Sequence, residues 1–277
     1  MNAGSSFGSF LAPVVLASDD PIDHVVPHAL FRIGEISITN TFFMLMLSAL
    51  LMLVLFPLAA KGKGLVPTGA RNFVESILQF IREGVARPVL HEATDRFIPF
   101  LWTAFFLILF ANILGMLPIT PLASLLTGSP SHLGGTATGD FSITIGLAAC
   151  AFFAIHIGGI KEQGFVHYCK NFAPHVPWPL LLLLVPLEIV GAIIKPFALC
   201  IRLFANMIAG HIVLAILLGF SKLLADGVGG VSLGATIGSI AGATFISLLE
   251  LFVAFLQAYI FTFLTTLFLG MAVHPEH

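Results

Sequence analysis

The sequence predicts an all-α integral membrane protein with five membrane-crossing helices plus an amphipathic surface helix, the last two crossing helices forming a long tilted hairpin. Three observations support this prediction. Of the 277 residues only 9% are charged, whereas soluble domains carry about 25% charged residues. The mean hydropathy is +1.03. Several apolar runs also exceed the roughly 20 residues that a helix needs to cross about 30 Å of hydrocarbon.

The first two expected membrane helices cover residues 36–60 and 98–118, and neither run contains Asp, Glu, Lys or Arg. Residues 1–35 are expected to form an N-terminal tail, and residues 36–277 form the membrane domain. The tail has no basic leader before its short apolar patch, so we do not expect a cleaved secretory signal. Residues 67–90 carry apolar side chains at helical spacing with charged ones between them, which predicts an amphipathic helix along the membrane surface.

The third expected span covers residues 141–160, and two longer apolar stretches follow at residues 180–220 and 232–271. As a single helix, each of these stretches would be about 60 Å long, twice the hydrocarbon thickness. Each is therefore two spans or one steeply tilted span. The stretch SKLLADGVGG, with three glycines, is a turn signal between the two apolar stretches, and neither stretch contains a comparable one, which favours two tilted helices in a hairpin.

The distribution of basic residues predicts the orientation of the chain. Lys and Arg number six from Lys61 to Arg96, none in residues 119–140, and two from Lys161 to Lys170. The positive-inside rule places the first and third of these connectors in the cytoplasm. The N-terminus is then outside and the C-terminus cytoplasmic.

Composition and motifs argue against several classes of function. A net charge of −2 offers no surface for nucleic acid. The long apolar runs make the lipid bilayer the expected surrounding. Cys150, Cys169 and Cys200 lack the spacing of metal ligands, and we expect neither a metal nor a cofactor. The stretch His91–Asp95 lacks the second histidine of a zinc protease, and no serine has a Gly-x-Ser-x-Gly context, which disfavours an intramembrane protease.

Ionisable residues inside the hairpin are the candidate functional groups. Glu188, Lys195 and Arg202 are seven residues apart, so they share one helix face, and Asn206 joins it. His211 lies about 180° round the helix from Arg202. In the second stretch, Glu250 and Gln257 are again seven apart.

A guanidinium in the middle of such a segment requires compensation. Arg202 cannot become neutral by losing a proton. Insertion scales give a cost of about 2.5 to 3.5 kcal/mol for placing an arginine at the centre of a membrane helix. Snorkelling, a structural ion pair, a partner carboxylate or a water-filled path would each compensate. Glu188 and Glu250 are plausible proton carriers or structural partners, and His211 is either a packing histidine or a proton relay.

At these residues the sequence resembles subunit a of the F-type ATP synthase, the stationary membrane partner of the rotating c-ring. The stretch PFALCIRLFANMIAGH resembles the family's central arginine motif. FANILGMLP (Phe110 to Pro118) resembles the end of one span, and LQAYIFTFLTTLFL (Leu256 to Leu269) resembles the C-terminal helix. The resemblance covers nearly all of the chain after about Asn40.

The resemblance implies that Arg202 faces the c-ring carboxylate and that Asn206 is the polar residue one turn further on. Glu188 and Gln257 then line or support the proton path. Many bacterial members have Glu where this chain has His211 and His where it has Glu250. The implied residues of proton translocation are Arg202, Glu188, Asn206, His211, Glu250 and Gln257.

The function implied by the resemblance is a non-catalytic stator subunit that provides two offset proton half-channels and couples proton flow to rotation, with no site for ATP itself. The implied partners are the c-subunit ring, the b-subunit peripheral stalk and the other F-type subunits. The implied location is the inner (plasma) membrane of a bacterium or, alternatively, an organelle inner membrane. A self-contained ion-coupled secondary transporter is the alternative, and the choice between protons and sodium ions stays open.

Overall fold

The computed structural model describes residues 29–33, 36–60, 69–117, 119, 134–171, 178–227 and 232–274. Most of the N-terminal tail, most of the loop at residues 119–140 and the turn between the two long stretches therefore lie outside the described residues. The chain forms two compact units. The first contains Met1–Ser48, Ala111–Asp140 and Phe204–Phe255, and the second contains Ala49–Phe110, Phe141–Leu203 and Leu256–His277.

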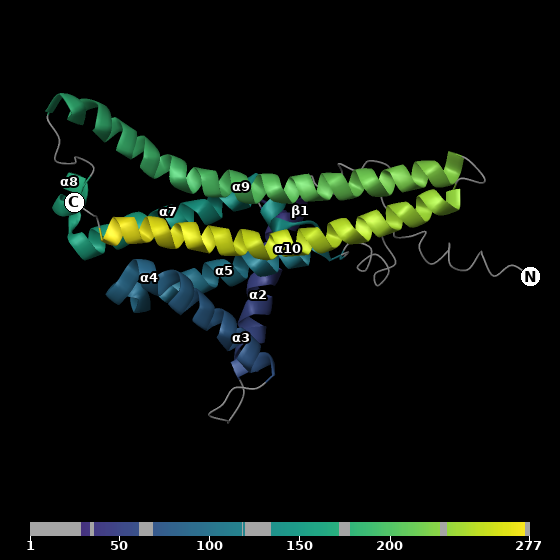
Figure 1. The fold of residues 1–277 in the computed structure, drawn as a ribbon, viewed down its shortest axis with the longest axis horizontal. Helices are drawn as coiled ribbons and strands as arrows, with labels where there is room; N and C mark the ends of the chain where they lie inside the picture. Colours follow the sequence, from purple (N-terminus) through teal and green to yellow (C-terminus); the bar gives the residue numbers. More distant parts are fainter. Residues whose placement is uncertain are drawn as a thin grey trace, which may run out of the picture. The chain divides into compact units, whose positions relative to one another are not determined.

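Within the described residues, five helices are long and apolar enough to cross a membrane. They occur in α2 (Asn40–Ala60), α5 (Thr94–Met116), α7 (Phe141–Gln163), α9 (Trp178–Gly227) and α10 (Ser232–Val273) (Figure 1). The short helix α8 (Phe165–Asn171) follows α7. The predicted fold class is thus confirmed.

The two long apolar stretches form one uninterrupted helix each (Figure 1). The 50 residues of α9 and the 42 of α10 correspond to about 75 Å and 63 Å at 1.5 Å per residue. Both lengths are at least twice the hydrocarbon thickness. Of the two possibilities that the sequence left open, a single long helix in each stretch is the one observed.

A small antiparallel hairpin precedes the first membrane helix. Strands β1 (Ala29–Ile33) and β2 (Ile36–Thr39) pair, with Phe31 opposite Ile38. Helix α2 therefore begins at Asn40 and not at residue 36, because the β-branched run of β2 is extended. The hydroxyl of Thr39 accepts a hydrogen bond from the amide of Phe42 at 3.3 Å, which caps the first turn of the helix.

The expected surface helix is divided into three segments. Helix α3 (Ala70–Gln79) continues into a π-helical segment, Phe80–Ala86, and then into the short helix α4 (Arg87–Leu90). The amide of Arg87 donates to the carbonyl of Arg82, five residues back. Pro88 follows and has no amide hydrogen, so it cannot continue the regular α-helical pattern of donors.

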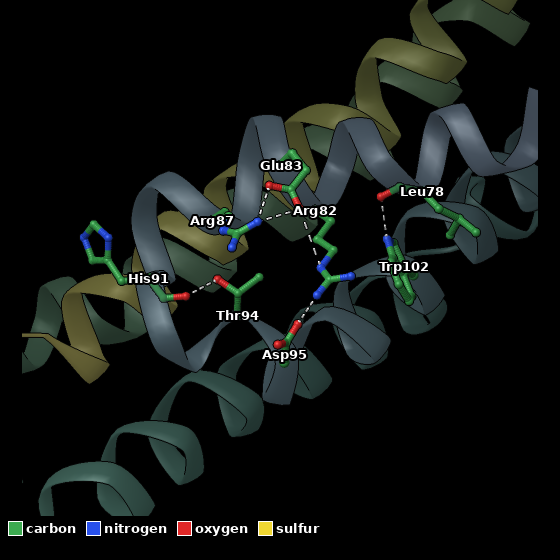
Figure 2. A network of polar contacts seen from close by, with 8 residues as sticks. All are labelled: Leu78, Arg82, Glu83, Arg87, His91, Thr94, Asp95 and Trp102. Carbon is green, nitrogen blue, oxygen red and sulfur yellow. Dashed lines mark hydrogen bonds and ion pairs between the residues drawn. The ribbon is translucent and has the colours of Figure 1, made fainter.

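Polar contacts join this segmented helix to α5 (Figure 2). Arg82 forms an ion pair with Asp95 at 2.6 Å, and the indole of Trp102 donates to the carbonyl of Leu78 at 3.0 Å. A turn of 3₁₀ helix, His91–Ala93, connects α4 to α5, and the Thr94 hydroxyl donates to the His91 carbonyl. The ion pair is exposed and contributes at most about 1 kcal/mol, so the connection depends on several weak contacts.

Candidate polar site

The C-terminal part of α9 and the N-terminal part of α10 run antiparallel in the first unit. A Cβ placed on Gly210 would lie 2.7 Å from the Oε1 atom of Glu250, and one placed on Gly242 would lie 3.2 Å from the side chain of Leu217. As residue numbers rise along α9, those of its neighbours on α10 fall. The two helices therefore pack as the arms of a hairpin.

His211 and Glu250 meet across this hairpin. The Nδ1 atom of His211 lies 3.8 Å from the Oε1 atom of Glu250, within the range of an ion pair. Glu250 is 7% exposed, and its Oε1 atom has no hydrogen-bond partner among the described residues. His211 is more accessible than Glu250, with side-chain exposures of 22% and 8%. The pair therefore consists of a partly exposed imidazole and a buried carboxyl group.

Gly210 provides the space for the carboxyl group of Glu250. At 2.7 Å, a methyl carbon would be closer to Oε1 than van der Waals contact allows. Glycine at this position lets the carboxyl group lie directly against the backbone of α9, next to His211.

A third element completes the surroundings of the imidazole. A hydrogen bond joins the hydroxyl of Thr136 to the Nε2 atom of His211. Thr136 is 6% exposed and precedes a single turn of 3₁₀ helix, Ala137–Gly139. The two ring nitrogens of His211 thus face two polar side chains, the Thr136 hydroxyl and the Glu250 carboxyl.

Asn112 anchors the segment that carries Thr136. The Thr138 hydroxyl donates to Oδ1 of Asn112 at 2.6 Å, and Nδ2 of Asn112 donates to the carbonyl of Ala254 at 3.3 Å. Thr138 and Asn112 are both fully buried. One amide side chain therefore links the end of α5, the segment at residues 134–140 and α10.

Thr136 was not predicted from the sequence. It lies in a Gly, Ser, Thr and Pro-rich stretch that reads as a connector. A connector has no periodicity from which a buried face can be assigned, so only the contact with His211 identifies this residue.

Arg202 and Glu188 lie on α9 in the second unit, and both side chains are exposed. Among the described residues, Arg202 makes no hydrogen bond or ion pair. Leu199, Cys200 and Leu203 beside it are buried. The guanidinium is therefore on the open side of α9.

The other polar residues of the hairpin differ in their surroundings. Asn206 is half-buried, and Gln257 is 5% exposed. Lys195 was predicted to share a helix face with Arg202. Its ammonium nitrogen lies 5.6 Å from the centre of the Phe268 ring, a cation–π contact. Of the six candidate residues, the structure brings His211 and Glu250 into contact.

Comparison with known proteins decides the family. A family model described as ATP synthase A chain matches residues 41–270. The chain belongs to this family. Its members are subunit a, the proton-translocating stator subunit of the F-type ATP synthase. The resemblance seen in the sequence motifs is thus confirmed.

Curated relatives agree with this assignment. The chain is 38% identical over 261 residues to ATP synthase subunit a 2 of Chlorobaculum tepidum, covering 92% of this chain and 69% of the relative. It is 42% identical over 248 residues to ATP synthase subunit a of Myxococcus xanthus, covering 88% and 75%. With the subunit of Maricaulis maris it shares 36% identity over 267 residues, covering 95% and 100%.

Two further conclusions follow from membership of the family. The chain is a multi-pass membrane protein, and other F-type ATP synthase subunits are its partners. The family assignment also favours a subunit of an assembly over a self-contained transporter.

Proposed function

We propose that the chain supplies the stator side of the proton path through two offset half-channels, with His211 and Glu250 as a proton relay in one of them. The observation that carries this proposal is their contact in the first unit, 3.8 Å between Nδ1 and Oε1. A packing histidine has no need for a buried carboxyl group with an unpaired oxygen. An imidazole and a carboxyl group at this distance can exchange a proton after a small approach.

The difference in accessibility gives the relay its order. The side chain of His211 is the more exposed of the two, and that of Glu250 is the more buried. The Nδ1 to Oε1 distance needs to shorten by about 0.8 Å to reach the usual length of roughly 3.0 Å for an N–H···O hydrogen bond. A proton that enters at His211 can then move to Glu250 without crossing exposed hydrocarbon.

Arg202 is proposed as the fixed charge that meets the carboxylate of a passing c subunit. Its exposure and its lack of a partner among the described residues support this role. An opposite charge favours the ionised form of an arriving carboxylate, which must therefore release its proton there. Because arginine keeps its charge in proteins, Arg202 also blocks a proton from passing straight between the half-channels.

The remaining roles follow the same path. Glu188, on the exposed side of α9, and Gln257, buried on α10, are proposed to line or support it, with Asn206 one turn beyond Arg202. Because α9 follows the connector that carries Lys161 and Lys170, we place its start at the cytoplasmic side. Glu188 then belongs to the cytoplasmic half-channel, and His211 and Glu250 belong to the outer one.

The proposed setting is the plasma membrane of a bacterium, with the N-terminus outside and the C-terminus in the cytoplasm. The c-ring is proposed to face Arg202, and the b-subunit peripheral stalk is proposed to hold the chain stationary. Each proton that crosses 100 mV then supplies about 2.3 kcal/mol for rotation.

ATP-driven proton pumping in vesicles that contain equal amounts of assembled enzyme tests the relay. His211→Leu and Glu250→Leu should each abolish pumping, because each removes one of the two titratable groups. Ile212→Leu, a change at an exposed neighbour on α9, is the matched control and should pump normally. Normal pumping by either leucine variant of the pair would overturn the relay assignment.

A further inference from the structure

We propose that Thr136 is a positioning residue of the proton path, whose hydroxyl holds the imidazole of His211 with Nδ1 directed at Glu250. The inference rests on the proposed relay role of His211 and Glu250. It begins from a geometric fact: the Thr136 hydroxyl bonds Nε2, while Nδ1 lies 3.8 Å from Oε1 of Glu250. Turning the ring over would place Cε1 and Cδ2 near the present positions of Nε2 and Nδ1, so both contacts would be lost.

The hydroxyl is suited to this position because it both donates and accepts. A neutral imidazole has one N–H donor and one acceptor nitrogen. When Glu250 is ionised, the favourable tautomer carries its proton on Nδ1, and the Thr136 O–H donates to Nε2. When Glu250 carries the proton, its O–H can donate to Nδ1, and Nε2–H then donates to Thr136. Rotation of one hydroxyl therefore serves both states.

The backbone of Thr136 is held in place from two sides. The amide of Gly139 donates to the Thr136 carbonyl at 3.0 Å, and the Thr138 hydroxyl anchors the same turn on Asn112. On its other side Thr136 packs against Gly115 near the end of α5. A Cβ at Gly115 would lie 2.5 Å from Oγ1 of Thr136 and 2.7 Å from its Cα.

Gly115 therefore allows Thr136 to approach. Because the close contact includes the Cα atom of Thr136, a rotation of its side chain would not relieve the clash. The segment itself would have to shift, and the hydroxyl would move relative to Nε2. The arrangement Gly115, Thr136, His211 and Glu250 thus works as a series of contacts in which each residue places the next.

Valine tests the hydroxyl, because it keeps the shape of threonine and removes the donor and acceptor. In vesicles with equal amounts of assembled enzyme, Thr136→Val should lower ATP-driven proton pumping by about tenfold, the effect of losing one hydrogen bond of ordinary strength. The pH profile of pumping should also change, because His211 would no longer be held toward Glu250. Among the described residues, Glu250 is the titratable group that faces His211. Thr136→Ser keeps the hydroxyl and should retain both the rate and the profile.

Two further variants keep the test decisive. Thr136→Ala removes the hydroxyl without placing a methyl group beside Nε2, and it should behave as Thr136→Val does. Thr266→Val makes the same isosteric change at a buried threonine whose hydroxyl donates to the Thr262 carbonyl, and it should leave the pH profile unchanged.

The outcomes separate this inference from the proposed relay. Normal pumping by Thr136→Val together with loss of pumping by His211→Leu would overturn the positioning role and keep the relay. A lowered rate with the wild-type pH profile in Thr136→Val would show that Thr136 acts by packing alone, which also overturns the inference. Normal pumping by His211→Leu would overturn the relay and this inference with it.

Discussion

Glu250 of α10 lies 3.8 Å from His211 of α9, and the carboxyl oxygen that faces the imidazole has no hydrogen-bond partner among the described residues. The pair places an acid and a base together inside the apolar hairpin. Leaving a buried carboxyl oxygen unpaired costs free energy, and such groups in native proteins call for an explanation such as a role in function. The geometry therefore connects a cost in stability to the proposed transfer of protons.

Exchanging the two residues tests whether both titratable groups matter more than their order. The double variant His211→Glu with Glu250→His keeps one acid and one imidazole facing each other across the hairpin. We expect it to retain more proton flux than Glu250→Leu or His211→Leu, measured per assembled complex. An exchange variant that assembles but is as inactive as Glu250→Leu would contradict a relay between them.

Replacing Arg202 by lysine tests the need for a permanent charge. Arg202→Lys should abolish ATP-driven pumping and proton-driven synthesis, because a desolvated lysine can lose its proton and offers no planar donor group. Arg202→Ala should in addition permit a passive proton leak. The measurements are proton flux and ATP synthesis in vesicles with equal amounts of enzyme. Near-normal synthesis by Arg202→Lys would mean that this residue serves packing or snorkelling.

Adding one methyl group at Gly210 tests the space beside Glu250. Gly210→Ala should displace the carboxyl group, since the new carbon would lie 2.7 Å from Oε1, and pumping should fall severalfold. Gly219→Ala is the matched control on the same helix, because a Cβ there meets no atom of the described residues within 4 Å beyond its own stretch of helix. Alanine is favoured over glycine inside a helix by about 1 kcal/mol, so propensity alone would stabilise both variants. Equal pumping by the two variants would contradict the proposed crowding at Glu250.

Cysteine labelling tests the proposed orientation. A single cysteine near Asp20 should react with a membrane-impermeant reagent from the outer side of intact cells, and one at His274 should react only after the membrane is opened. The native cysteines would first be replaced, because Cys150 and Cys169 are exposed. Labelling of both positions from the outside would rule out the proposed topology.

The sequence by itself determined the number and the approximate extent of the membrane helices. Long runs without Asp, Glu, Lys or Arg suffice for this, because the bilayer requires about 20 apolar residues whatever the neighbouring helices are. The seven-residue spacing also placed Glu188 and Arg202 on one face of α9, and the structure shows both side chains exposed. Periodicity along one helix can establish such a face without any knowledge of the fold.

Only the tertiary structure decided which distant residues meet. His211 and Glu250 are 39 positions apart, and no local pattern states that the α9–α10 hairpin aligns them. Thr136 lies in an irregular segment, and Gly115 and Gly210 matter only through the atoms that face them. Register between helices depends on the packing of side chains and of small residues across the interface. The sequence therefore named the acid and the imidazole, whereas the packing brought them together and added the hydroxyl.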